Sequence, residues 1–412
     1  MEPRGTDKEK AFRSGFSRRR ILLPVLIGLL AAGWLLVRDL RAPRFEPAAD
    51  GRGGFVWTDA NGNGIADAGD PADFSATADG SGAYRRLTAR DALADVNWTW
   101  HSTGWLLLAL LFTAFRDLGY IVRIRILTSK QLGWRSSFNA VMLWEFACNL
   151  APSVVGGTAF AAFILQREGI ALGRSTAIVL VTAMLDELFY IITVPLVFAF
   201  VGMAALFPPH LDEAFGGLRM MVVFWIGYAV IVAMTLAVWY AVFFRPRAIK
   251  HWTLKLFQWK PLRRWRQDIA DTGHDLVLAS ADLKQRPAGY WAKGFAATVW
   301  GWASRFLVVN CLAAAFFPVS DHMLLYARQL VMWVILLISP TPGASGFAEL
   351  AFAGFFKDLL PALGLVAALA LVWRLLTYYL YVVIGVIILP RWLRRPHVAK
   401  AIPHSAIRPP HQ

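Results

Sequence analysis

Long runs of hydrophobic positions, separated by short polar segments, dominate this chain. A helix that spans a bilayer needs about 20 mostly apolar residues, and several runs reach or approach that length. The clearest runs are Ile21–Val37, Thr103–Phe115, Ser175–Leu206, Met220–Phe244, Phe295–Phe317, Met323–Ser339 and Leu360–Leu389. The pattern therefore predicts an all-α polytopic membrane protein with about seven spanning helices.

Proline and glycine interrupt two of the hydrophobic segments in their middle. The residues at the first break, within Ser136–Leu165, include Asn149, Pro152, Gly156 and Gly157. Those at the second break, within Met323–Ala353, include Pro340, Pro342, Gly343 and Gly346. Irregular backbone at membrane depth is tolerated only inside protein or beside a water-filled cavity. We therefore expect each segment to form a re-entrant pair of half-helices.

The basic residues, which give the chain a net charge of +15, indicate how these segments are oriented. Lys and Arg concentrate in residues 1–20, in Arg245–Arg266 and directly after the last hydrophobic run, and such loops mark the cytoplasmic side of a membrane protein. The passes through the membrane balance only if the two broken segments enter from opposite faces. That arrangement is an inverted repeat, as in many transporters whose binding sites lie near the midplane. The alternative is that one or both segments are kinked spans.

Charge and hydropathy together divide the chain into five parts. They are a basic cytoplasmic N-terminus (1–20), a first transmembrane helix (21–37), an extracytoplasmic loop (38–97), a transmembrane domain (98–395) and a cytoplasmic tail (396–412). A cleaved signal peptide is the alternative for the first helix, but no Ala-x-Ala site follows it closely. We expect a multi-pass protein of the cytoplasmic (inner) membrane.

Charged residues inside the hydrophobic runs are the candidates for a binding site, because a charge near the bilayer centre costs at least about 2.5–3.5 kcal/mol. They are Arg116, Glu145, Asp186, Glu187, Arg305, Glu349 and Arg374. A guanidinium group suits phosphate because it donates two parallel hydrogen bonds. The helix N-termini that follow the two breaks can add backbone donors. We expect Arg305 and Arg374 to line one cavity together with the residues of the breaks. The alternative is that these charges neutralise each other.

The predicted outer loop carries a separate metal-binding pattern. Oxygen ligands and a central glycine follow the spacing of a twelve-residue calcium loop. The proposed ligands are Asp59, Asn61, Asn63, Ile65 through its carbonyl, Asp67 and Asp70. The last ligand is Asp instead of the usual Glu, and no amphipathic helices flank the loop. A cluster of turn residues is the alternative to a Ca²⁺ site. We expect no other cofactor.

Common enzyme motifs are absent from the sequence: there is no Gly-x-Ser-x-Gly, no His-Glu-x-x-His and no phosphate-binding Gly-Lys-Ser/Thr. The basic blocks lie beside hydrophobic runs, which favours anionic lipid headgroups over nucleic acid as partners. The sequence thus predicts a protein that binds or translocates a phospholipid or a lipid-linked anionic molecule. A partner enzyme or a second copy of the chain is left open. The alternatives are a lipid-modifying enzyme that uses Asp186 and Glu187, and a transporter of small anions or ions.

Four motifs resemble the lysylphosphatidylglycerol synthase transmembrane, or flippase-like, family. They are Trp134-Arg135, Asn149-Leu-Ala-Pro152 with Gly156-Gly157, Pro340-Thr-Pro-Gly-Ala-Ser-Gly-Phe-Ala-Glu349, and Trp373-Arg374. Ala344 stands where the family often has a second glycine. The resemblance covers about residues 98–395 and implies a helical domain proposed to move or bind phospholipids. In the aminoacyl-lipid synthases of the family a soluble aminoacyltransferase domain follows. We expect no such domain here, and therefore no synthesis of lysyl-lipid by this chain alone.

Overall fold

A computed structural model describes the strands of the predicted outer loop and most of the transmembrane domain. Apart from a few isolated residues, the described ranges are 44–48, 53–60, 71–77, 79–87, 98–150, 154–208, 211–212, 216–245, 277–337, 344–360 and 365–394. The basic N-terminus, nearly all of the predicted first transmembrane helix and the C-terminal tail lie outside the described residues.

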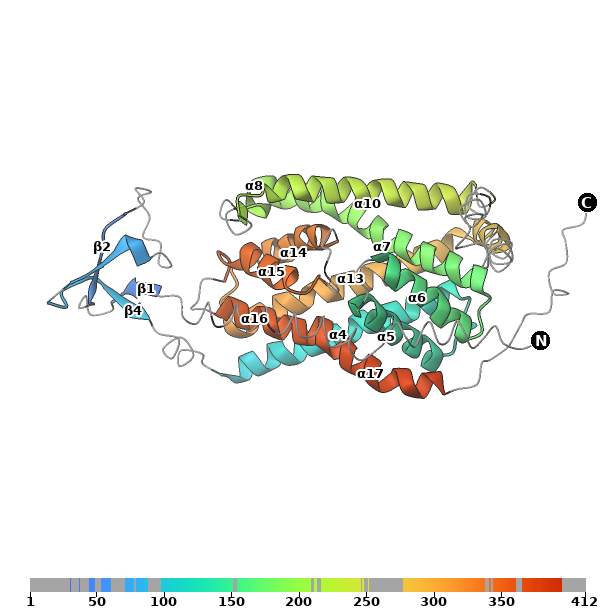
Figure 1. Cartoon of the computed structure of the whole chain (residues 1–412), viewed down its shortest axis with the longest axis horizontal. Coiled ribbons are helices and arrows are strands. Elements are labelled where there is room, and N and C mark those ends of the chain that lie inside the picture. Colours follow the sequence, from blue (N-terminus) through green and yellow to red (C-terminus); the bar gives the residue numbers. More distant parts are fainter. Residues whose placement is uncertain are drawn as a thin grey trace, which may run out of the picture.

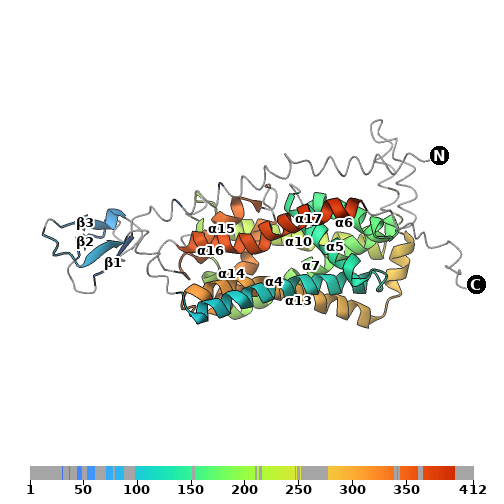
Figure 2. The ribbon, with the colours of Figure 1, turned by 90° about the horizontal axis from the view of Figure 1, so that it is seen from below.

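Five helices of the described part are long and apolar enough to cross a membrane. They are α4 (Trp100–Leu127), α7 (Leu172–Val201), α10 (Met220–Phe243), α13 (Ala288–Phe316) and a helix formed by α16 (Leu365–Arg374), a π-helical turn (Leu375–Tyr379) and α17 (Leu380–Leu393). Figures 1 and 2 show these helices side by side along the long axis of the molecule. The short helix α8 (Met203–Leu206) follows α7. The prediction of a helical polytopic membrane protein is confirmed.

The two segments broken by proline and glycine form helix pairs in opposite halves of the bundle. The first pair is α5 (Trp134–Leu150) and α6 (Val154–Arg167). The second pair is α14 (His322–Leu336) and α15 (Phe347–Phe356). Each of the four helices is shorter than the roughly 20 residues of a typical membrane span. Both views place α5 and α6 in one half and α14 and α15 in the other (Figures 1 and 2).

Glycine allows α4 and α13 to pack closely at the centre of the bundle. A Cβ atom on Gly119 would lie 2.9 Å from the backbone nitrogen of Gly301, and one on Gly301 would lie 2.5 Å from the ring of Tyr120. Small residues at helix contacts let backbones approach in this way. The close approach positions the polar side chains of α4 beside those of α13.

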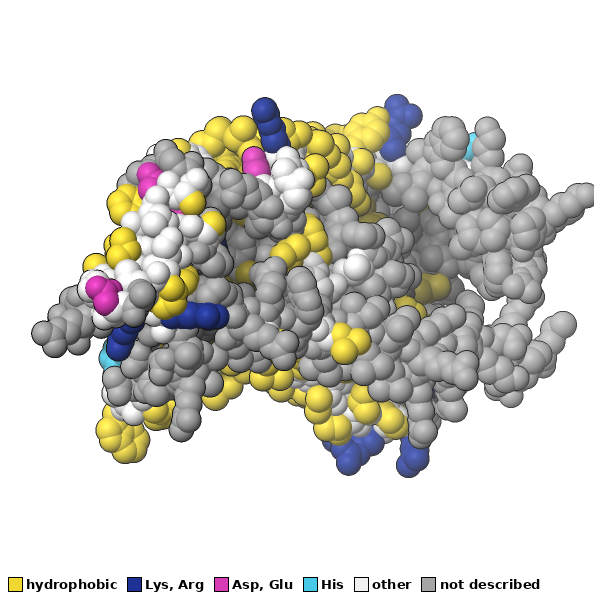
Figure 3. Space-filling model, turned by 60° about the vertical axis from the view of Figure 1, so that its left-hand side comes forward, with side chains coloured by type: hydrophobic (Ala, Val, Ile, Leu, Met, Phe, Trp, Pro, Cys, Tyr) yellow, Lys and Arg dark blue, Asp and Glu magenta, His cyan; other side chains and the backbone are white. Residues whose placement is uncertain are grey.

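One face of α10 is hydrophobic and exposed. Its side chains include Trp225, Ile226, Val230, Met234 and Leu236. Figure 3 shows hydrophobic side chains in yellow along the upper edge of the molecule, where α10 lies. In a chain of spanning helices, such a surface is suited to contact with lipid tails.

A small antiparallel sheet, which the expectation of helices alone did not include, lies beyond the end of the bundle where α4 begins (Figure 1). We call this end the sheet end. The strands are β1 (Arg44–Pro47), β2 (Phe55–Trp57), β3 (Phe74–Ala76) and β4 (Tyr84–Leu87), in the order β1-β4-β2-β3. Phe45 stacks on Phe74 with ring centroids 4.3 Å apart and contacts Phe55 edge-on at 4.9 Å. These aromatic side chains form the core of the sheet.

The calcium-loop motif lies between two paired strands of this sheet. Trp57 of β2 pairs with Phe74 of β3, so residues 58–73 connect neighbouring antiparallel strands. Asp59, the first proposed ligand, has a left-handed backbone with a φ of 45°. The other proposed ligands, Asn61, Asn63, Ile65, Asp67 and Asp70, lie outside the described residues. The calcium site stays a prediction.

Candidate functional site

A cavity of about 210 Å³, lined by hydrophobic side chains and a few charged ones, lies in the helical bundle. Its walls come from α4, α5, α7, α13 and α14. The last turns of α5 and α14, the two helices that run into the breaks, both reach it through residues such as Cys148 and Trp333. The charged side chains that line it are Arg123, Glu145, Asp186, Glu187 and Arg305. Four of these five residues are among the predicted site residues.

The first ion pair of the cavity joins α4 to α7. The guanidinium of Arg123 donates to Asp186 Oδ1 and, at 3.2 Å, to the hydroxyl oxygen of Thr298. The indole nitrogen of Trp302 donates to the same oxygen of Asp186 at 2.7 Å. Asp186 therefore has a charged partner and a second donor within the protein.

The second ion pair joins α4 to α5. Arg116 is almost completely buried and donates to Glu145 Oε2. Its guanidinium lies 4.6 Å from the ring centroid of Tyr381 and 3.4 Å from Asp117 Oδ1, which also accepts a 2.8 Å hydrogen bond from the Tyr381 hydroxyl. Arg116 and Glu145 therefore neutralise each other.

Arg305, in contrast, contacts aromatic rings and forms no salt bridge with a carboxylate among the described residues. Its guanidinium carbon lies 4.1 Å from the ring centroid of Trp333 and 5.2 Å from that of Trp302. Its Nε is buried and makes no hydrogen bond to any described residue. Cation–π contacts contribute about 0.5–2 kcal/mol and leave the N–H donors at the edge of the guanidinium available. Arg305 is thus a cation that aromatic rings hold at the cavity wall and that forms no salt bridge with a described residue.

Glu187 is the acidic residue of the lining that has no salt bridge among the described residues. The Thr235 hydroxyl of α10 donates to Glu187 Oε2 at 2.6 Å, and the same hydroxyl lies 2.8 Å from the Ile231 carbonyl oxygen. No Lys, Arg or His of the described residues forms a salt bridge with Glu187. Arg305 and Glu187 are therefore the two charged residues of the lining that form no salt bridge with a described residue.

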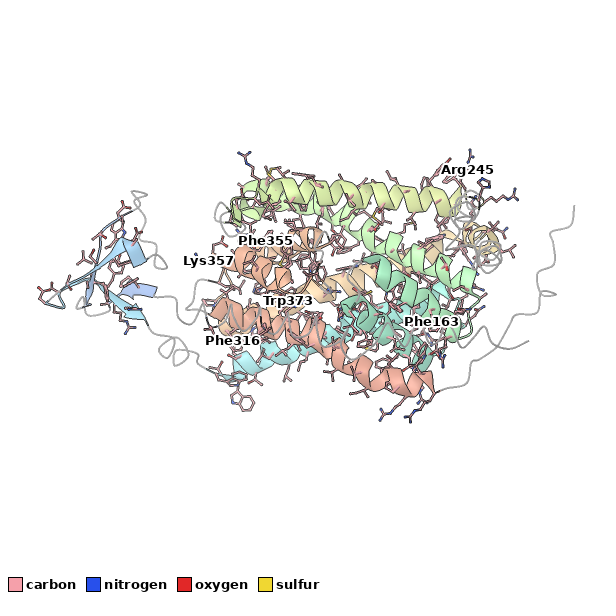
Figure 4. The ribbon with its side chains drawn as sticks, viewed as in Figure 1. Phe163, Arg245, Phe316, Phe355, Lys357 and Trp373 are labelled. Atoms are coloured by element: carbon pink, nitrogen blue, oxygen red, sulfur yellow. The ribbon has the colours of Figure 1, made fainter. Side chains whose placement is uncertain are left out.

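The second break carries its own ion pair, in which Arg374 is occupied. Arg374 Nε donates to Glu349 Oε1 at 2.9 Å, and both side chains are almost completely buried. Glu349 Oε2 accepts the backbone N–H of Gly346 at 2.8 Å. The guanidinium of Arg374 lies 4.3 Å from the ring centroid of Tyr378. Trp373, labelled in Figure 4, stacks on Phe352 of α15 at 5.1 Å.

These contacts correct two expectations about the second break. Arg374 is not among the residues that line the cavity, so it does not share that wall with Arg305. The Gly346 N–H, expected to serve a bound anion, is occupied by Glu349. Arg374 and Glu349 connect α16 to the first turn of α15 and hold the break in place.

The remaining predicted site residues lie around the first break. Asn149 donates from Nδ2 to the Tyr378 carbonyl oxygen at 3.3 Å, which connects the end of α5 to the π-helical turn. Such turns occur frequently at functional sites. Gly156 and Gly157 lie in the first turn of α6. Pro152, Pro342 and Gly343 lie outside the described residues.

Sequence reasoning missed a fourth ion pair, at the sheet end of the bundle. Arg328 of α14 donates to both carboxylate oxygens of Asp358, at 2.5 and 2.9 Å, and to the carbonyl oxygens of Phe355 and Ala205, both at 2.8 Å. Arg328 lies in the middle of a hydrophobic run, and that position was a signal that could have identified it.

Comparison with known proteins agrees with this architecture. The model of the lysylphosphatidylglycerol synthase TM region matches residues 88–385. The chain belongs to this family. A curated relative, a UPF0104 membrane protein of Archaeoglobus fulgidus, is 24% identical over 297 residues, which cover 69% of this chain and 85% of the relative. Family membership and the helical bundle identify a multi-pass integral membrane protein.

Proposed function

We propose that this protein binds the headgroup of a phospholipid or a lipid-linked anionic molecule in the central cavity and moves it across the membrane. Arg305 is the observation that carries the proposal. It is a cation at the cavity wall, held by two tryptophan rings, with no carboxylate partner among the described residues. A phosphate would supply the missing acceptor, since a guanidinium can donate two parallel hydrogen bonds to it.

The position of the cavity supports translocation as the purpose of binding. The breaks of two helix pairs from opposite halves of the bundle lead toward it, through the last turns of α5 and α14. Transport sites at such breaks can be reached in turn from either side when one half moves against the other. In this proposal the headgroup passes Arg305 while the acyl chains stay in lipid, beside exposed hydrophobic faces such as that of α10.

We assign the sheet end to the outer face of the cytoplasmic membrane. Basic residues concentrate at the opposite end, where α4 and α17 finish and α7 begins; they include Arg125, Lys130, Arg135, Arg174 and Arg391. Arg245, which follows α10, is labelled at that end in Figure 4. An excess of Lys and Arg in short loops favours the cytoplasmic side.

The environment of the two acids favours a carrier over a lipid-modifying enzyme. Asp186 is held by Arg123 and Trp302, and Glu187 accepts a hydrogen bond from Thr235. Neither carboxylate lies beside an activated nucleophile among the described residues. The proposal therefore assigns them to binding and positioning, and it expects the lipid to leave chemically unchanged.

Transport in liposomes tests the proposal. Purified protein is reconstituted with fluorescent phospholipids, and the rate at which label reaches the opposite leaflet is compared among wild type, Arg305→Ala and Arg219→Ala. Arg219 precedes α10 and is exposed, so its variant is a matched loss of one guanidinium away from the cavity. We expect transport by wild type and Arg219→Ala and at least about a tenfold loss in Arg305→Ala, which corresponds to about 1.4 kcal/mol.

Three outcomes would contradict the proposal. Equal rates in wild type and Arg305→Ala would remove Arg305 from the pathway. A new lipid product, detected by mass spectrometry, would favour an enzyme. Uptake of inorganic phosphate or chloride without lipid movement would favour a transporter of small anions.

A further inference from the structure

The contacts of the Thr235 hydroxyl indicate the protonation state of Glu187. Thr235 Oγ1 lies 2.6 Å from Glu187 Oε2 and 2.8 Å from the carbonyl oxygen of Ile231, one turn earlier in α10. Both are normal distances for O–H···O hydrogen bonds. A backbone carbonyl and an ionised carboxylate can only accept hydrogen bonds, and a hydroxyl has one hydrogen to donate. Two full hydrogen bonds at this oxygen therefore require a second hydrogen.

A protonated Glu187 provides that hydrogen. Threonine within a helix readily donates to the carbonyl oxygen four residues earlier, which for Thr235 is that of Ile231. The oxygen of the hydroxyl then accepts a hydrogen bond from the carboxyl O–H of Glu187, instead of donating to an ionised carboxylate. Because Thr235 is buried, its hydroxyl depends on partners inside the protein, and the protonated acid satisfies both of its contacts.

The charges in and around the cavity also balance without Glu187. Two of the three arginines form salt bridges there, and the third, Arg305, attracts the carboxylates of Glu145 and Asp117 without a salt bridge to either. The three guanidiniums and three carboxylates are those of Arg116, Arg123, Arg305, Asp117, Glu145 and Asp186. An ionised Glu187 would add a fourth carboxylate, which the neighbouring Asp186 repels. Such an unpaired charge is costly inside a membrane helix.

The helices around Glu187 leave it as the acid that can exchange a proton. Glu187 is half-buried near the middle of α7 (Leu172–Val201). α10, which packs against it there, has no charged residue between Met220 and Phe243. The other titratable groups of the lining are Tyr120 and Arg123 of α4, Glu145 and Cys148 of α5, Asp186 and Tyr190 of α7, and Arg305 of α13. Of the acids among them, Glu145 and Asp186 are held in salt bridges.

We infer that Glu187 is a proton-binding site, protonated in this structure, and that it couples movement of the headgroup to movement of a proton. The coupling rests on the proposed function, whereas the protonation does not. A phosphate near Arg305 favours neutral Glu187, because an ionised carboxylate in the same cavity repels it. By linkage, loss of the proton favours release of the phosphate. The carboxyl O–H therefore forms on the acidic side and breaks on the alkaline side, where water takes the proton, and both ligands cross in the same direction.

Infrared difference spectroscopy of the full chain tests the protonation without transport. The carbonyl stretching band of a protonated carboxyl is compared at neutral pH among wild type, Glu187→Gln and Asp321→Asn. Asp321 is the exposed N-cap of α14, and asparagine keeps an acceptor for the Leu324 N–H, so its variant is a matched loss of one carboxyl outside the cavity. We expect the band in wild type and Asp321→Asn and its loss in Glu187→Gln.

Two features keep this measurement decisive. Glutamine is neutral and keeps a donor for Thr235 Oγ1, so Glu187→Gln retains the hydrogen bonds assigned to the protonated acid. If that variant does not fold, Thr235→Val should shift the same band, because the carboxyl loses its acceptor. Identical spectra of wild type and folded Glu187→Gln would mean that Glu187 is ionised and shares a single hydroxyl hydrogen with Ile231, which would overturn the inference.

Liposomes with a pH difference across the membrane test the coupling. Movement of fluorescent phosphatidylglycerol and phosphatidylethanolamine is measured with the alkaline side inside or outside. For wild type and Asp321→Asn we expect movement toward the alkaline side to be severalfold faster than movement toward the acidic side. In Glu187→Gln, whatever movement remains should be equal for the two polarities, because the amide takes up no proton.

The outcomes separate the inference from the proposed function. Wild-type transport that is equal for the two polarities, or a folded Glu187→Gln that responds to the gradient as wild type does, would overturn the coupling and leave lipid transport in place. No lipid movement by any of the proteins would contradict the proposed function, and the infrared band would still decide whether Glu187 binds a proton.

Discussion

Arg305 and Arg374 both lie within hydrophobic helices, yet their surroundings differ. Arg374 donates to Glu349 at 2.9 Å, and Glu349 in turn accepts the Gly346 N–H, so this arginine stabilises the second break. Arg305 rests on Trp302 and Trp333 without a carboxylate partner among the described residues. One guanidinium is thus neutralised by a buried carboxylate, whereas the other is held by aromatic rings at the cavity wall. The comparison teaches that a buried charge indicates function when its partner is missing.

The largest expected effect is a loss of stability when the ion pair between Arg374 and Glu349 is broken. Glu349→Ala should lower the free energy of unfolding by about 3–5 kcal/mol, because it leaves Arg374 buried without its partner. Denaturant unfolding in mild detergent measures the change. The double variant Glu349→Leu with Arg374→Leu, which removes both charges, should recover much of the loss. A cost below about 1 kcal/mol in Glu349→Ala would mean that the pair does not hold the break.

A smaller effect, on lipid binding, is expected when the aromatic ring that contacts the Arg305 guanidinium is removed. Trp333→Leu removes the ring 4.1 Å from the Arg305 guanidinium and should weaken phospholipid binding by about 0.5–2 kcal/mol, or roughly twofold to thirtyfold. Trp300→Leu, at an exposed position of α13, is a matched control. Equal affinities in wild type and folded Trp333→Leu would show that the ring does not position the cation.

A substitution in the second break, beside the ion pair of Arg374 and Glu349, should increase the stability of the protein. Ala344 has a φ of 53°, in the left-handed region where a side chain is strained. Ala344→Gly should therefore stabilise the protein by about 0.5–1 kcal/mol, after the greater entropy of glycine in the unfolded chain is counted. Thermal unfolding checks the sign, and a lower midpoint would contradict this reading of the turn.

The smallest expected effect on the free energy of unfolding is that of removing Arg305. Arg305→Ala should change the free energy of unfolding by less than about 1 kcal/mol, because no carboxylate loses its partner, and a slight gain is consistent with a residue kept for function. The same denaturant experiment as for Glu349→Ala provides the value. A loss as large as that expected for Glu349→Ala would mean that Arg305 stabilises the fold.

Much of the helical architecture could be predicted from the sequence, because hydrophobic length and charge asymmetry are local properties of the chain. Both broken segments appear as helix pairs, and all seven charged candidates take part in ion pairs or line the cavity. What could not be predicted is which charge is paired with which. Arg123 meets Asp186 across 63 positions of sequence and Arg374 meets Glu349 across 25, and only packing decides such partners.

The segment before α4 was harder to interpret. Its strands are three or four residues long, too short to give a clear alternation of polar and apolar positions. The turn motif that begins at Asp59 was conspicuous instead, because its spacing follows a known ligand pattern. Its placement between β2 and β3 fits a loop that a cation would order, and calcium binding there stays a prediction.

The central claim, that a headgroup occupies the cavity on Arg305, can be tested through Cys148. This exposed cysteine of α5 lines the cavity, whereas Cys311, the other cysteine, is buried. In a Cys311→Ser background, we would measure alkylation of Cys148 by a small maleimide with and without phosphatidylethanolamine, in the presence and absence of Arg305→Ala. We predict that the lipid slows alkylation severalfold only when Arg305 is present. Equal protection in both proteins, or none in either, would contradict the account.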